Sequence, residues 1–136
     1  NGGGYPGNGS RDSRYEPNNF SNQAYNLGRI SGIQQVPGLR IASTVQQDRD
    51  WFRFRTRNSG PTTVQIDMDD SAGDLDLIVY RRTGTGTLQE IGRSTNRGGG
   101  GTETVSFNAT AGEQYFFQIF GYNGGTGNYG ITITAP

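Results

Sequence analysis

The chain has 136 residues, with twelve arginines balanced by twelve acidic residues and no lysine, histidine or cysteine. This length fits one domain, but only 30% of the residues are hydrophobic, so the core must be thin, as between two facing sheets. The zero net charge provides no long-range field for nucleic acid, and no apolar run approaches the length that spans a membrane. The missing residue types remove thiolate, Ser–His and Schiff-base catalysis, so we expect no enzyme.

The chain begins with a glycine-rich arm, residues 1–13, which precedes a predicted domain over residues 14–136. The arm shows no hydrophobic periodicity, and Tyr5 and Pro6 are its candidate side chains for binding or assembly. Such a segment could lie along a sheet edge as an added strand, either on its own domain or on a second copy of the chain.

From Leu27 onward, short apolar runs alternate with turns rich in Gly, Asn and Ser, and only residues 19–26 could hold a helical turn. Nine short strands at this spacing predict an all-β sandwich or barrel. The predicted strands are Leu27–Ile33, Leu39–Thr44, Trp51–Arg57, Thr63–Asp69, Leu75–Arg81, Leu88–Arg93, Thr102–Phe107, Gln114–Phe120 and Tyr129–Thr134.

Strict alternation in two of these strands indicates which side chains enter the core. If the two strands form a hairpin with the loop 58–62, Phe54 lies opposite Ile66 on the apolar face. On the outer face, Arg53 then lies opposite Asp67 and forms a cross-strand ion pair.

Several acidic residues stand close together in the sequence. Paired carboxylates can cleave glycosides, but surface charge beside turns is the simpler interpretation of these acids. The residues concerned are Asp67, Asp69 and Asp70, together with Asp74 and Asp76. A second group offers hard oxygen ligands that suit calcium, although acids that cap turns would look the same. That group consists of Glu16, Asn18, Asp48 and Asp50.

Six segments in a fixed order resemble the bacterial pre-peptidase C-terminal domain family. The resemblance covers about residues 14–134. The segments are Tyr15-Glu-Pro-Asn-Asn19 with Leu27-Gly28 after it, Asp50-Trp-Phe-Arg-Phe54, Gly73-Asp-Leu-Asp-Leu-Ile-Val-Tyr80, Gly112-Glu-Gln-Tyr-Phe-Phe117, Gly121-Tyr-Asn-Gly124 and Gly127-Asn-Tyr-Gly-Ile-Thr-Ile133.

This resemblance implies a jelly-roll-like antiparallel β-sandwich of eight or nine strands, appended to secreted bacterial proteins. The related collagenase modules bind collagen and use calcium near their N-terminal linker, which again singles out Glu16, Asn18, Asp48 and Asp50 as candidate ligands. The chain departs from those modules at Arg14, where they carry a second acid, and an arginine there would repel a cation. The resemblance also makes Asp74 and Asp76 part of a family signature, which we interpret as orienting the turn before the strand.

Aromatic residues on the outward face of the strand 114–120 are candidates for a contact surface, unless a loop covers them. They are Phe116 and Phe120, with Tyr80 and Tyr122 expected nearby. We therefore expect a secreted, non-catalytic binding or adhesion module that recognises an extracellular protein or polysaccharide. The alternative is a structural subunit that self-assembles through its arm into a filament or surface layer. No cofactor is required in either case, apart from the candidate calcium.

Overall fold

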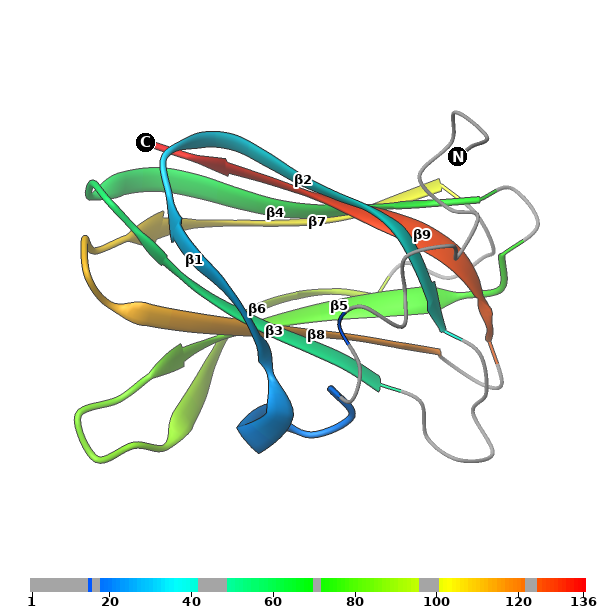
Figure 1. Ribbon diagram of the computed structural model, residues 1–136, viewed down its shortest axis with the longest axis horizontal. Coiled ribbons are helices and arrows are strands. Elements are labelled where there is room, and N and C mark those ends of the chain that lie inside the picture. Colours follow the sequence, from blue (N-terminus) through cyan, green and yellow to red (C-terminus); the bar gives the residue numbers. More distant parts are fainter. Residues whose placement is uncertain (1–14, 16–17, 42–48, 70–71, 96–100, 122–124) are drawn as a thin grey trace.

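The structure is a computed structural model that describes residues 15, 18–41, 49–69, 72–95, 101–121 and 125–136. Its strands form two facing sheets, which appear as two layers in Figure 1. The five-stranded sheet has the order β1 (Tyr25–Ile30), β3 (Arg49–Thr56), β8 (Gln114–Gly121), β5 (Leu75–Arg82) and β6 (Leu88–Ser94). The four-stranded sheet has the order β2 (Gly32–Ile41), β9 (Gly127–Ala135), β4 (Gly60–Met68) and β7 (Gly101–Ala109). The predicted all-β sandwich is confirmed.

Nearly every connection in the described chain crosses from one sheet to the other. Among the described strands, β5 and β6 are the only two that are consecutive in sequence and also neighbours in a sheet. All pairs are antiparallel except β1 with β3, which is parallel. Neighbours in the sequence are therefore rarely neighbours in a sheet.

The predicted hairpin between residues 51–57 and 63–69 is wrong for this reason. β3 lies in the five-stranded sheet and β4 in the four-stranded sheet. Phe54 lies opposite Tyr115 of β8, and Ile66 lies opposite Ile131 of β9. Both strands still direct their apolar side chains into the same core, because alternation fixes the buried face of a strand and not its partner.

The predicted ion pair between Arg53 and Asp67 is also wrong, because the two residues belong to different sheets. Asp67 instead accepts hydrogen bonds from Gln65 Nε2 at 3.0 Å and Thr102 Oγ1 at 3.2 Å. Arg53 Nε donates to the carbonyl of Ala24 at 3.4 Å.

The core lies between the sheets and is rich in aromatic rings, which bury large apolar areas and so drive folding. Its buried tyrosines satisfy their hydroxyl groups: Tyr129 donates to Asp50, and Tyr115 accepts from the backbone N–H of Thr110 at 2.8 Å. The largest fully buried side chains include Tyr115, Tyr129, Phe52, Phe54 and Phe117.

The first predicted strand, residues 27–33, is divided between β1 and β2, which meet at Ser31. β2 then continues through Pro37, where its register with β9 shifts between Val36 and Leu39. A proline is tolerated there because β2 is an edge strand and a bulge removes the need for its N–H. The predicted helical turn is the 3-10 turn η3 (Ser21–Gln23). Within the described ranges no helix is long and apolar enough to cross a bilayer.

Candidate functional site

The outer face of the five-stranded sheet carries a connected group of aromatic and polar side chains. Trp51 of β3 stacks on Tyr80 of β5, with ring centroids 5.2 Å apart. Gln118 of β8 links this stack to Arg49: its Nε2 donates to the Tyr80 hydroxyl at 2.6 Å, and its Oε1 accepts from Arg49 Nη1 at 2.9 Å. The Arg49 guanidinium also lies 4.9 Å from the ring centre of Phe120. Burial raises the pKa of Tyr80, so its hydroxyl stays protonated at neutral pH.

The predicted contact residues Tyr80, Phe116 and Phe120 share this face, since Tyr80 lies opposite Phe116 in the register of β5 and β8. Their exposure differs from the expectation of an open aromatic surface. Phe116 is only 6% exposed, whereas Tyr80 and Phe120 are half-buried. Tyr5, Pro6 and Tyr122 lie outside the described residues. The role of all six in binding or assembly stays a prediction.

Two adjoining grooves lie at the end of this face where η3 and the β5–β6 hairpin project from the sheet (Figure 1). The first has a volume of about 440 Å³, and the second of about 470 Å³. Arg82 and Gln114 line both grooves, and Arg82 Nη1 donates to Gln114 Oε1 at 3.3 Å. Phe116 forms part of the first groove and Glu113 part of the second.

Four arginines border these grooves: Arg53, Arg55, Arg81 and Arg82. Three of them are exposed and Arg53 is half-buried. Their hydrogen bonds go to neutral oxygens, and none of the four forms an ion pair with a carboxylate in the described part of the chain. The grooves therefore combine concave shape with an excess of positive charge, since Glu113 is their only acidic lining residue among those that the structure describes.

The structure describes two of the four candidate calcium ligands. Asn18 and Asp50 are both fully buried and lie beside each other, because the Asn18 carbonyl accepts from the backbone N–H of Trp51 at 2.8 Å. Asp50 accepts the hydroxyl of Tyr129. Glu16 and Asp48, and also Arg14, lie outside the described residues. Calcium at this position stays a prediction.

Comparison with known families decides the identity of the fold. Residues 48–121, more than half of the chain, match the model of the bacterial pre-peptidase C-terminal domain. The chain belongs to this family. The resemblance noted in the sequence is thereby confirmed. A comparison with curated protein sequences finds no match.

Solved structures with the same fold come from several bacteria. The pre-peptidase C-terminal domain of a Bacillus anthracis collagenase has a TM-score of 0.57 at 14% identity, covering 82% of this chain and 94% of that one. A mitogen from Yersinia pseudotuberculosis gives 0.56 at 19%, covering 79% and 88%. CorA, a surface-associated copper-binding protein of Methylomicrobium album BG8, gives 0.57 at 8%, covering 83% and 98%. At such identities the likeness concerns the fold of this pre-peptidase C-terminal domain.

Some candidate functional residues could not be identified from the sequence. The groove arginines were visible only as alternating charges, because sequence does not reveal that Arg53 and Arg82, on different strands, face one groove. The interpretation of Asp76 as surface charge is wrong, because this residue is only 3% exposed. Glu103, 2% exposed on the other sheet, had no sequence signal beyond standing at an inward position of its strand.

Proposed function

We propose that this pre-peptidase C-terminal domain is an extracellular, non-catalytic module that binds an anionic polysaccharide along the arginine-lined grooves. The observation that carries the proposal is the set of four groove arginines with no carboxylate partner among the described residues. Membership of a family that serves as a non-catalytic domain in related proteins supports the binding role.

Arginine suits an acidic ligand because its planar guanidinium presents paired donors that match carboxylate and sulfate groups. In the grooves, Arg55 and Arg81 already hold their side chains in place through hydrogen bonds to the Gly112 carbonyl and to Gln89. Less rotamer freedom is then lost when a ligand binds.

The shape favours an extended ligand over a small one. The two grooves adjoin at Arg82 and Gln114, so an extended ligand that passes η3 and the β5–β6 hairpin could contact both. The half-buried side chain of Leu88 adds apolar contact for a sugar ring, and Phe116 contributes only its small exposed part. The zero net charge of the chain provides no long-range attraction for any polyanion, so binding would depend on short-range contacts with the groove arginines, and the test below distinguishes a polysaccharide from nucleic acid.

The test measures binding of the purified full chain to immobilised polygalacturonate, with fully methyl-esterified polygalacturonate as the neutral matched ligand. We expect binding to the acidic form, which weakens as salt screens the charges. Arg82→Ala should reduce affinity about tenfold or more, since a hydrogen bond to a charged group contributes roughly 1.5–3 kcal/mol.

Arg40→Ala is the matched control, because Arg40 is an exposed arginine of β2 in the other sheet. It removes the same charge and should leave the affinity unchanged. Any of three results would overturn the proposal. They are an equal loss of affinity in Arg82→Ala and Arg40→Ala, equal binding of the chain to the acidic and the neutral polymer, and preferential binding to single-stranded DNA.

A further inference from the structure

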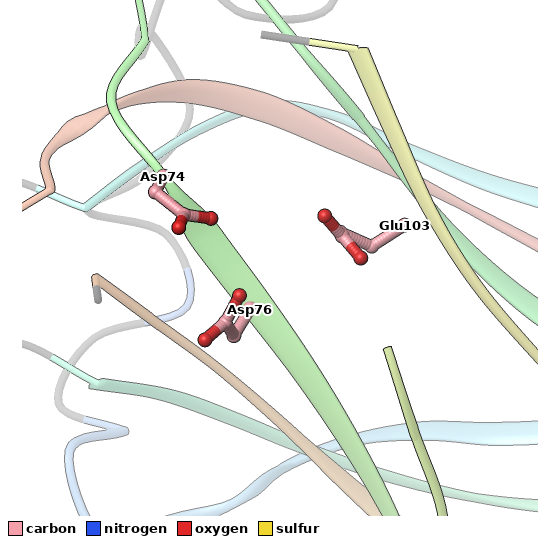
Figure 2. A group of neighbouring side chains, drawn as sticks. All are labelled: Asp74, Asp76 and Glu103. Atoms are coloured by element: carbon pink, nitrogen blue, oxygen red, sulfur yellow. The ribbon is translucent and has the colours of Figure 1, made fainter. Parts of the chain in front are cut away.

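Three carboxylates from both sheets converge at the end of the sandwich opposite the grooves. Asp74 directly precedes β5, Asp76 belongs to β5, and Glu103 belongs to β7. One oxygen from each lies within 4.8 Å of the other two. Figure 2 shows the Asp74 carboxylate directed toward Glu103 and an oxygen of Asp76 turned toward Asp74.

Asp76 and Glu103 are buried and Asp74 is half-buried, and two of these acids hold oxygen atoms that no described residue satisfies. Asp76 is 3% exposed and Glu103 is 2% exposed. Oδ1 of Asp74 and Oδ1 of Asp76 are both buried, and neither has a hydrogen-bond donor among the residues that the structure describes. A buried oxygen without a donor or a cation is costly, so such atoms point to a missing partner.

Protein cations in the described chain do not supply that partner. The pKa of Asp76 is raised to about 7, mainly by burial and then by the nearby carboxylates of Asp74 and Glu103. Arg93 acts in the opposite direction, but its guanidinium is bound to both carboxylate oxygens of Glu90, at 2.7 and 2.6 Å. Arg93 is therefore already engaged by Glu90 and leaves the unsatisfied oxygens of Asp74 and Asp76 without a donor among the described residues.

The main chain and a neighbouring hydroxyl hold the carboxylates in place. A β-carbon at Gly125 would lie 2.4 Å from the Asp74 carbonyl oxygen, so glycine permits a close approach that fixes the Asp74 backbone. The Ser94 hydroxyl donates to Glu103 and accepts from the backbone N–H of Thr104 at 3.3 Å. Hydrogen bonds of this kind orient carboxylates that bind a metal.

The geometry fits calcium. Ca²⁺ binds oxygen at about 2.3–2.6 Å, so two ligands of one ion can lie up to about 5 Å apart, and the three oxygens lie within 4.8 Å of one another. Calcium also accepts irregular sets of carboxylate and carbonyl oxygens, whereas Mg²⁺ demands a near-ideal octahedron. The donor set is all oxygen, which excludes a preference for zinc or copper.

We propose that Asp74, Asp76 and Glu103 form a calcium site that joins the start of β5 to β7 across the sandwich. This site is separate from the candidate set around Asp50, which lies on β3, with β8 between that strand and β5. Bidentate carboxylates, water and backbone carbonyls would complete the six to eight oxygen ligands that calcium takes.

The experiment is isothermal titration of calcium into the full chain after chelator treatment, with the number of bound ions as the readout. We expect Asp76→Asn and Glu103→Gln each to remove one bound ion, or to weaken one site about tenfold or more. Asp67→Asn is the matched control, because Asp67 is a partly exposed carboxylate on the outside of β4 and should bind no ion.

Two further measurements make the result decisive. In chelator, Asp76→Asn should melt at or above the melting temperature of the wild type, because the substitution removes one of three neighbouring carboxylates. This result would show that any loss of calcium binding in the variant does not come from a loss of folding. Glu16→Gln separates this site from the linker candidates. If wild type binds no calcium, or if Asp76→Asn binds as many ions as wild type while Glu16→Gln loses one, the proposal is overturned.

Discussion

Burial and two neighbouring carboxylates give Asp76 a pKa of about 7, well above the value of about 3.9 in an unfolded chain. A raised pKa in the folded state means that the native protein holds a proton that the unfolded chain releases. Its contribution to stability is therefore complete below about pH 4 and is lost as the pH rises through about 7. After burial, the charges of Asp74 and Glu103 raise the pKa of Asp76, and the charge of Arg93 lowers it.

We predict that, in chelator, the free energy of unfolding falls between pH 4 and pH 7 in wild type and falls less in Asp76→Asn. Urea denaturation across this range measures both slopes. Equal slopes in the two proteins would show that Asp76 titrates normally in the native state.

At the scale of elements, the rings shared between β3 and β8 hold the sandwich together. Phe117 is fully buried, stacks on Phe52 with centroids 5.3 Å apart, and contacts Phe54 edge-on at 6.0 Å. We predict that Phe117→Ala lowers the free energy of unfolding by about 3–5 kcal/mol through lost burial and the cavity left behind.

Phe20→Ala is the control for this change, since Phe20 is 65% exposed. It should alter the free energy of unfolding by no more than about 0.5 kcal/mol. Similar denaturation midpoints for Phe117→Ala and Phe20→Ala would contradict the assignment of the core.

The strands show where sequence reasoning succeeds and where it stops. Alternation in Phe52 to Phe54 and Val64 to Ile66 predicts which face each strand buries, because period two is a local property. It says nothing of the partner strand, and here β4 pairs with β7 and β9 rather than with β3. Pairing depends on connections that cross the sandwich, which leave no local signal.

The same limit explains the acidic cluster. Asp74 and Asp76 stand in the sequence as an evident pair, but Glu103 approaches them only because β7 of the other sheet passes close to β5. A cluster assembled from two sheets is visible only after the fold is known. The family, in contrast, is recognisable from segments of sequence, and the matching model confirms it.

At the scale of the whole molecule, the two proposed sites lie at opposite ends of β5. Arg82 stands six positions after Asp76, which corresponds to about 20 Å along a strand. Substitutions that far apart, with no shared partner, normally act independently. Failure of the calcium proposal would therefore leave the polysaccharide proposal untouched, and the reverse also holds.

The last prediction concerns the glycine-rich arm, which lies outside the described residues. Ordering each backbone residue would cost about 1–2 kcal/mol, so an ordered arm would need contacts of Tyr5 and Pro6 with a protein surface to offset that cost. If the surface belongs to a second copy, the contacts run head to tail and produce a filament unless the rotation closes a ring. Deletion of residues 1–12 should then leave the melting temperature of the sandwich nearly unchanged and abolish assembly.

Sedimentation and electron microscopy measure the assembly of the full chain and of the deletion variant. A variant that carries both Tyr5→Ala and Pro6→Ala keeps the length of the arm. A monomeric full chain, or a deletion variant that assembles as well as the full chain, would rule out the filament and leave the binding module as the function.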